Sequence, residues 1–341
     1  MKLGGIELAA VKLGVIGVGH MGRHHARIYS EMPGVDLVAV VDTNELVARE
    51  IAKKYNTSYY LDYHQLVEKV DAVSIATPTS FHYPIAVALL DAGIHVLIEK
   101  PITSTVKEAK TLIQLSKMKN LVLQVGHTER FNPAVISLNG LVKKPIFIET
   151  HRMGPPTRRN LDIGVVFELM IHDIDIILNL VKSPIVKMQG FGLKVYSNHE
   201  DIVQAQILFE NGCLASLSAS RISSEKVRNL EITQEEGFLH LDYIEQNIIL
   251  RKQISSKYIF DQPKAMYRSE FLLEQPMICK DEPLRLEIEH FIECLRENKQ
   301  PIVSGEDGKA AIEIGKQIVE SLIVVESDEH KLMRELFAVR R

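Results

Sequence analysis

Short apolar runs alternate with amphipathic segments through the first third of the chain. The runs cover residues 12–18, 37–42, 72–78, 95–100 and 121–127. Between them, segments such as residues 44–55 and 105–119 repeat apolar side chains at helical spacing. This alternation predicts a parallel sheet with helices on both faces, that is, a doubly wound α/β domain.

The pattern changes after about residue 128. A predicted helix at residues 164–182 is followed by runs at 201–210, 213–221, 228–237 and 246–253 that alternate with a period near two. Such alternation is typical of antiparallel strands with one covered face. Two helical stretches, at about 284–298 and 305–325, close the chain. We expect a short extension at 1–11, a doubly wound domain at 12–127 and an α+β domain at 128–341.

Composition limits the classes of function. A chain of 341 residues is long enough for two cores, and its formal charge of −4 comes from interspersed acidic and basic residues. This favours a small-molecule partner over nucleic acid or a membrane surface. Cys213, Cys279 and Cys294 are far apart and form neither a CxxC pair nor a zinc motif. We expect no metal site, no signal peptide, no membrane span and a cytoplasmic location.

A glycine-rich turn follows the first predicted strand. Gly17, Gly19 and Gly22 form a GxGxxG pattern, with His20 and Met21 inside it, at the start of a predicted helix. Glycine allows the backbone to approach a pyrophosphate closely, and the helix N-terminus offers N–H groups to the anion. Asp42, at the end of the second strand, is placed to accept hydrogen bonds from an adenosine ribose. A dinucleotide cofactor is predicted, with NAD favoured over NADP because a carboxylate repels a 2′-phosphate.

The strand at 95–100 ends in Glu99 and Lys100, followed by Pro101. Ligands of an open parallel sheet bind beyond the carboxyl ends of its strands, so both charges are expected near cofactor and substrate. An ammonium group there can hold a substrate hydroxyl and stabilise the developing oxyanion. Glu99 is either a contact near the nicotinamide or the partner that keeps Lys100 charged. The alternative is a surface ion pair in a loop.

Glu168 and His172 are four residues apart in the predicted helix at 164–182, so they are expected on one helix face. The imidazole is a natural acceptor for the proton of an alcohol, and the carboxylate can orient it. The alternatives are a helix-surface pair or a buried structural histidine, and no further ligands suggest a metal. His24 and His25, in the first helix, are expected to be structural.

Five stretches carry a family resemblance: residues 18–22, 76–82, 98–101, 126–133 and 168–175. In order and spacing, the chain from Lys12 to about Val325 resembles the Gfo/Idh/MocA family of NAD(P)-dependent oxidoreductases. The resemblance implies a Rossmann domain, a C-terminal domain with a large, mostly antiparallel open sheet, and a homodimer or homotetramer.

The resemblance also implies residue roles. Lys100 corresponds to a catalytic lysine whose following proline, here Pro101, is often cis. Thr77, Pro78 and His82 border the cofactor. Glu168 and His172 correspond to a catalytic Asp-x-x-x-His pair, with Glu where Asp is usual.

The substrate is the least determined part of the prediction. Residues 126–133, 149–175 and 301–315 look most like the branch that oxidises the 3-hydroxyl of UDP-N-acetylglucosamine. Arg158 and Arg159 could clamp a diphosphate, or belong to a solvated basic loop. Arg130 and Asn132 could contact sugar or nicotinamide, or pack at a helix N-terminus. A free sugar, an inositol, a UDP-sugar acid, or a non-catalytic dinucleotide sensor are the alternatives.

Overall fold

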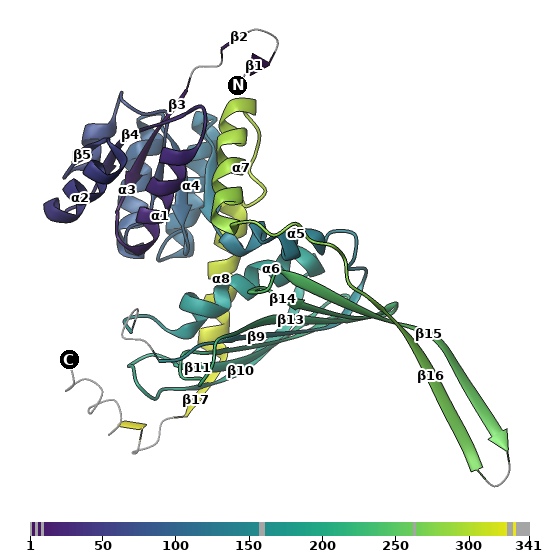
Figure 1. The fold of residues 1–341 in the computed structure, drawn as a ribbon. Helices are drawn as coiled ribbons and strands as arrows, with labels where there is room; N and C mark the ends of the chain where they lie inside the picture. Colours follow the sequence, from purple (N-terminus) through teal and green to yellow (C-terminus); the bar gives the residue numbers. More distant parts are fainter. Residues whose placement is uncertain are drawn as a thin grey trace. The chain divides into compact units, whose positions relative to one another are not determined.

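The computed structural model describes residues 2–3, 6–7, 10–156, 161–261, 264–325 and 330–331. The chain forms two compact units (Figure 1). Unit 1 comprises Met1–Phe131 and Glu282–Glu313, and unit 2 comprises Asn132–Asp281 and Ile314–Arg341. Among the described residues, no helix combines the length and the apolar character that a membrane span requires.

Unit 1 contains a six-stranded parallel sheet in the order β5-β4-β3-β6-β7-β8. The strands are β3 (Val11–Ile16), β4 (Val35–Val41), β5 (Ser58–Tyr60), β6 (Ala72–Ile75), β7 (His95–Glu99) and β8 (Leu123–Gly126). The strand order reverses at β3 and β6, which is where doubly wound sheets bind ligands. Five strands confirm the sequence prediction; β5 was not predicted because its three residues carry no apolar periodicity. A short pair, β1 (Lys2–Leu3) and β2 (Ile6–Glu7), precedes the sheet.

Helices cover both faces of this sheet. They are α1 (His20–Glu31), α2 (Glu45–Tyr55), α3 (His82–Asp91) and α4 (Val106–Lys119), with short 3-10 turns η1 (Tyr63–Leu66), η2 (Thr79–Phe81) and η3 (Thr128–Phe131). Helix α1 packs with α2, and α3 packs with α4. Helix α4 begins with a capping box. The Thr105 hydroxyl accepts the backbone N–H of Glu108, and the Glu108 carboxylate accepts the backbone N–H of Thr105.

Unit 1 also includes α7 (Pro283–Glu297), which is far from the Rossmann segment in sequence. The helix carries apolar residues at 284, 288, 291 and 292, all on one face, and they are buried in the same core as Leu13 and Tyr29. The compact units therefore differ from the linear division into 12–127 and 128–341, because the apolar face of α7 packs against α1.

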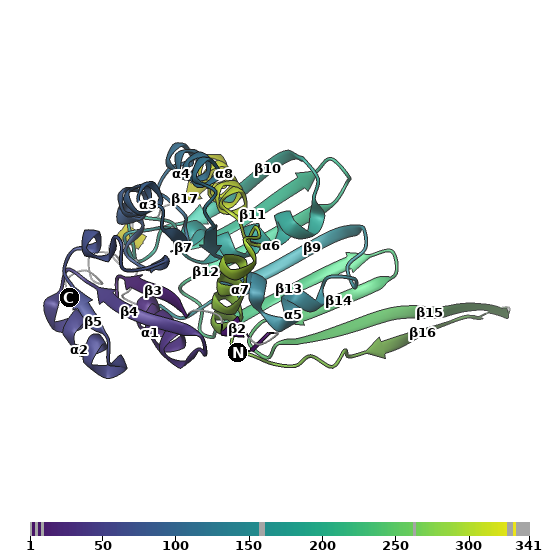
Figure 2. The ribbon, with the colours of Figure 1, turned by 90° about the horizontal axis from the view of Figure 1, so that it is seen from above.

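Unit 2 is built on a nine-stranded sheet in the order β16-β15-β14-β13-β9-β12-β11-β10-β17. The strands are β9 (Pro145–Met153), β10 (Ile185–Leu193), β11 (Ile202–Phe209), β12 (Leu214–Ser220), β13 (Val227–Gln234), β14 (Gly237–Asp242), β15 (Asn247–Asp261), β16 (Lys264–Glu274) and β17 (Leu322–Val325). Most pairs are antiparallel, whereas β9/β12 and β10/β17 are parallel. Strands β15 and β16 extend well beyond their neighbours (Figure 2).

One face of this sheet is covered by α5 (Pro133–Ser137), α6 (Ile171–Val181) and the C-terminal part of α8 (Gly305–Ser321) (Figure 1). Their apolar residues, such as Val135, Ile174 and Ile318, share a core with inward-facing strand residues such as Ile148 and Leu217. The prediction of a helix through residue 325 was wrong at its end. Residues 322–325 form β17, because the β-branched run Ile-Val-Val pairs with β10.

Candidate active site

The glycine loop joins β3 to α1. Gly17 has a φ of +81°, and its N–H donates to the carbonyl of Val41 at 2.8 Å. A Cβ atom on Gly22 would lie 1.8 Å from the carbonyl oxygen of Gly17, so the loop and the helix are in direct backbone contact. A Cβ on Gly19 would meet no described atom within 4 Å. No side-chain hydrogen bond caps α1 at Gly19, which leaves its first turn available to an anion.

Asp42 is fixed beside this loop. One carboxylate oxygen accepts the Val18 N–H and the other accepts the Asn44 N–H, both at 2.9 Å. The carboxylate therefore links the end of β4 to the glycine loop, and it retains lone pairs for a ribose hydroxyl. His20 and Met21, the first residues of α1, are exposed next to the loop.

A cavity of about 570 Å³ opens at this edge of the sheet. Gly17, Gly19, Asp42, Thr77 and Pro78 line it, together with apolar side chains from neighbouring segments. Its volume is in the usual range for small-molecule sites. The structure thus brings together the glycine loop, Asp42 and the Thr-Pro turn, as the sequence predicted from segments far apart in the chain.

His82 lies beneath this turn instead of in the cavity lining. Its ring nitrogens contact the carbonyl oxygens of Thr77 and Pro101, each at 2.9 Å. Burial lowers the pKa of His82, although both carbonyls favour the protonated ring. The side chain ties the Thr-Pro turn to the segment after β7, and the Lys100–Pro101 peptide is cis.

Lys100 is half-buried at the end of β7. The preceding Glu99 is buried, and its carboxylate accepts the Lys100 backbone N–H at 3.2 Å and contacts His25 Nε2 at 3.1 Å. Burial alone would raise the pKa of Glu99, but the hydrogen bond and charge of His25, with Lys100, lower it. Glu99 is therefore a buried carboxylate that supports the Lys100 backbone from below.

His25 continues this buried network. Its Nδ1 contacts Ser74 Oγ at 3.0 Å, and Ser74 Oγ contacts the hydroxyl of Tyr29 at 2.5 Å. The expectation that His25 is structural missed its contact with Glu99, which spans 74 residues of sequence. The sequence feature that could have indicated this contact is a histidine on the buried face of the helix that follows the glycine loop.

Glu287, from α7, is a second buried carboxyl group in unit 1. Burial raises the pKa of Glu287 well above its usual value, and the nearby charge of Glu99 adds to this effect. The Thr128 side chain lowers the pKa of Glu287 but opposes the shift only in part. Burial therefore favours the protonated form of Glu287, whereas the contacts of the neighbouring Glu99 favour its ionised form.

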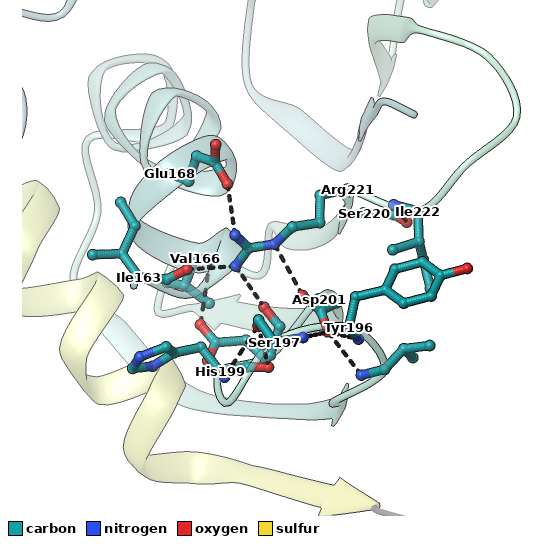
Figure 3. Close-up of polar contacts among 12 residues, drawn as sticks. Ile163, Val166, Glu168, Tyr196, Ser197, His199, Asp201, Ser220, Arg221 and Ile222 are labelled. Atoms are coloured by element: carbon teal, nitrogen blue, oxygen red, sulfur yellow. Dashed lines mark hydrogen bonds and ion pairs between the residues drawn. The ribbon is translucent and has the colours of Figure 1, made fainter. Parts of the chain in front are cut away.

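In unit 2, Glu168 and His172 lie where two helical geometries meet. Glu168 belongs to a π-helical turn, η4 (Val166–Met170), and His172 is the second residue of α6. The predicted helix at 164–182 is present as η4 followed by α6, but its first turn is π-helical and therefore wider than an α-helical turn. The side chain of Glu168 forms an ion pair with Arg221 at 3.1 Å (Figure 3).

Arg221 follows β12, and sequence reasoning did not select it. Its Nε lies 3.1 Å from Asp201 Oδ1, and only 5% of its side chain is exposed. Arg221 is a charged residue at the end of the apolar run 213–221. The same pattern, at the end of residues 95–100, led to the prediction for Lys100.

The substrate candidates are placed differently. Arg130 is buried in unit 1, and its guanidinium donates to the carbonyl of Ile302 at 3.2 Å. Asn132 caps α5 through the Ala134 N–H and donates to the carbonyl of Tyr243, both at 3.0 Å. The structure accounts for both side chains by packing and capping, and a substrate contact stays a prediction. Arg158 and Arg159 lie outside the described residues.

The residues of unit 1 fit a dinucleotide. A Cβ atom on Gly17 or Gly22 would collide with backbone atoms, whereas the space at Gly19, which lines the cavity, is open. The hydroxyl of Thr77 is buried and has no hydrogen-bond partner among the described residues, so it can serve a ligand. In the same part of the chain, no three His, Cys, Asp or Glu side chains gather as they would around a metal ion.

Comparison with known proteins identifies the family of the chain. Residues 11–127 match the family model described as "Oxidoreductase family, NAD-binding Rossmann fold", and residues 147–240 match the "GFO/IDH/MocA C-terminal domain". The UDP-N-acetylglucosamine 3-dehydrogenase of Acidithiobacillus ferrooxidans is 36% identical over 239 residues, covering 70% of this chain and 76% of that protein.

A solved structure of that enzyme has a TM-score of 0.83 at 31% identity, covering 92% of this chain and 98% of the enzyme. The scyllo-inositol 2-dehydrogenase (NAD(+)) of Bacillus subtilis is 28% identical over 329 residues, covering 89% of this chain and 92% of that protein. The chain therefore belongs to the Gfo/Idh/MocA family and is an oxidoreductase that acts on CH–OH groups with a nicotinamide dinucleotide cofactor.

Proposed function

We propose that this enzyme oxidises the 3-hydroxyl of UDP-N-acetylglucosamine to the 3-keto sugar nucleotide. The observation that carries the proposal is the similarity to the Acidithiobacillus ferrooxidans UDP-N-acetylglucosamine 3-dehydrogenase, which extends over 92% of this chain in the structural comparison. The inositol 2-dehydrogenases are related at lower identity and support a free cyclitol as the second candidate substrate.

NAD is the proposed cofactor. When bound, this cofactor would supply the acceptor for the hydride that leaves the substrate carbon. Asp42, anchored through the Val18 and Asn44 N–H groups, places a fixed carboxylate at the end of β4. A 2′-phosphate there would face this negative charge, which disfavours NADP.

The proposed catalytic residues are Lys100 and His172. The Lys100 ammonium holds the substrate hydroxyl and stabilises negative charge on its oxygen, and His172 takes the hydroxyl proton as the carbonyl forms. Glu168 sets the position of His172. Arg158 and Arg159 are proposed to bind the diphosphate.

NADH formation across a panel of substrates tests the proposal. The panel contains UDP-N-acetylglucosamine, UDP-N-acetylglucosaminuronate, free N-acetylglucosamine, glucose, myo-inositol and scyllo-inositol, each with NAD and with NADP. We expect absorbance at 340 nm to rise fastest with NAD and UDP-N-acetylglucosamine. A higher kcat/KM for an inositol would replace the proposed substrate. An unchanged KM for the UDP-sugar in an Arg158→Ala, Arg159→Ala double variant would reject the diphosphate contact.

Single substitutions test the catalytic roles. Lys100→Met and His172→Asn are expected to lower kcat by about 10²–10⁴-fold, since each removes a group that acts in proton transfer or charge stabilisation. The NADH affinity, measured by fluorescence titration, should stay near that of the wild type. Near-normal turnover in either variant would remove that residue from the mechanism.

We also propose that the enzyme is a homo-oligomer in which two copies meet through the exposed face of the unit 2 sheet. This face carries a hollow of about 680 Å³ lined by Phe238, Phe271 and Leu273, among others. All three side chains are more than half exposed. A second copy of the same surface would remove them from water.

A further inference from the structure

Two buried arginine–carboxylate pairs hold the segment that carries His172. Arg152, on β9, binds Asp173 through two parallel hydrogen bonds of 2.8 Å. Arg221, after β12, pairs with Glu168. His172 thus lies between two carboxylates that are each fixed to the sheet.

The two arginines come from the same end of neighbouring strands. Strands β9 and β12 are parallel, with Arg152 opposite Ala219 and Met153 opposite Ser220. The next residue after β12 is Arg221. The sheet register therefore sets the spacing of both guanidinium groups.

Arg221 connects several segments at once (Figure 3). Besides Glu168 and Asp201, its Nη2 donates to the carbonyl of Ile163 and, at 3.2 Å, to that of Glu200. Ile163 lies three residues before Val166, where η4 begins. One guanidinium group thus holds both the entry to the π-helical turn and a side chain from its middle.

Asp201 gives this guanidinium a rigid support. It is completely buried, and one of its carboxylate oxygens accepts the N–H groups of Val195, Tyr196 and Ser197 at 2.7, 2.7 and 3.0 Å. Its other oxygen faces Arg221. The backbone N–H groups of residues 195–197 therefore hold Asp201 in place. Asp201 in turn holds Arg221, and Arg221 holds Glu168.

We propose that Arg221 is a positioning residue for the oxidation, which holds His172 in place through Glu168 and the π-helical turn. The proposal rests on the proposed role of His172. It assigns Glu168 to anchoring His172 through its 3.1 Å contact with Arg221, and not to changing the proton affinity of the imidazole through its charge.

Three variants separate these roles. In Arg221→Lys the charge remains, but an ammonium cannot span Glu168 and Asp201 as the planar guanidinium does. We expect kcat to fall by about 100-fold, as a misplaced catalytic group predicts, while the KM for NAD stays unchanged. Glu168→Leu removes the same contact from the other side and is expected to match this loss. Glu168→Gln keeps an oxygen for Arg221 and should lower kcat by less than about tenfold.

The matched control is Arg228→Lys. Arg228 also lies in unit 2, where its guanidinium donates to the carbonyls of Met153 and Val227. We expect it to keep kcat within about twofold of the wild type. The pH dependence of kcat/KM should show the same apparent pKa in the wild type and in Glu168→Gln. If Glu168→Gln loses as much kcat as Glu168→Leu, or shifts that pKa, the carboxylate charge acts on His172 and the proposal is wrong.

A readout without turnover keeps the test independent of the substrate. In ¹H–¹⁵N spectra of the histidine rings, the His172 signal is identified by its loss in His172→Asn. We expect this signal to move in Arg221→Lys and Glu168→Leu and to stay in place in Arg228→Lys. An unmoved signal in both of the first two variants overturns the positioning role, even when no substrate of the panel is oxidised.

Discussion

Gly22 and Gly19 belong to one loop but have opposite surroundings. A methyl group on Gly22 would enter the backbone of Gly17, whereas one on Gly19 would enter open space. We expect Gly22→Ala to lower the free energy of unfolding by about 1–3 kcal/mol, as overpacking does, and to weaken NADH binding at least about tenfold. Gly19→Ala should change stability by less than about 0.5 kcal/mol and weaken binding alone. Urea unfolding and NADH fluorescence titration measure the two effects, and unaltered stability in Gly22→Ala would contradict the loop geometry.

The raised pKa of Glu287 makes a prediction about pH. The folded protein keeps a proton on Glu287 at pH values where the unfolded chain, with a pKa near 4.5, has released it. Stability is therefore lost as pH rises from the unfolded toward the folded pKa, by up to about 1.4 kcal/mol per pH unit. Glu287→Gln removes this loss because the amide is neutral throughout.

Urea unfolding at about pH 5, 6.5 and 8 checks the sign of this effect, because the loss of stability grows with each pH unit between the unfolded and the folded pKa of Glu287. The free energy of unfolding of Glu287→Gln minus that of the wild type should increase with pH. Glu50→Gln, which replaces an exposed glutamate of α2, serves as the control. Parallel profiles for the wild type and Glu287→Gln would show that Glu287 is ionised in the folded protein.

At the scale of residues, part of the candidate site could be predicted from local sequence. Gly17, Gly22 and Asp42 were predictable because their backbone and charge requirements follow directly from the strand and turn around them. The contacts of Glu99 with His25 and of Arg221 with Glu168 join residues 74 and 53 positions apart. No periodicity or spacing reports such a pairing, so the supports of Lys100 and His172 required the fold.

At the scale of elements, α7 is an amphipathic helix whose partner decides its role. Phe291 is completely buried in the core of unit 1, together with α1 and the sheet. We expect Phe291→Ala to cost about 3–5 kcal/mol of stability and to reduce NADH binding through loss of the folded unit. Thermal unfolding with and without NADH measures this.

A matched control is Leu46→Ala, which removes an exposed leucine from α2 of unit 1. It should change stability by less than about 0.5 kcal/mol. Equal destabilisation by the two substitutions would argue against the burial of α7. Apolar spacing at 284, 288, 291 and 292 predicted that this helix exists, but the same stripe would fit either core, so its place could not be derived from sequence.

The regular strands of unit 1 were the easiest elements to predict, because each is a continuous apolar run bounded by a turn. The π-helical turn η4 was not, since the pattern of its residues is that of an ordinary helix. Likewise, β17 continues the helical stretch of α8 in sequence, and only pairing with β10 reveals it as a strand.

At the scale of the whole molecule, the exposed sheet face makes a prediction about assembly. Phe238→Glu with Leu273→Glu places two charges on the surface proposed to meet a second copy. We expect the double variant to sediment as a monomer where the wild type sediments as a dimer or tetramer, because burying unpaired charges is unfavourable. Leu46→Glu, at an exposed site on α2, is the control and should sediment as the wild type does. A monomeric wild type would refute the assembly, and an intact oligomer in the double variant would place it elsewhere.

The split construction of unit 1 also has a consequence for how the chain is made. Residues 1–131 leave the ribosome first, but the core that they form is closed by Leu284, Ile288, Phe291 and Ile292. More than 150 residues must be synthesised before that apolar surface is covered, a time of roughly 8–30 s at about 5–20 residues per second. The half of the enzyme that is encoded first is thus among the last to be completed, and the nascent chain presents an open hydrophobic face that chaperones can bind while the unit 2 sheet is still being translated.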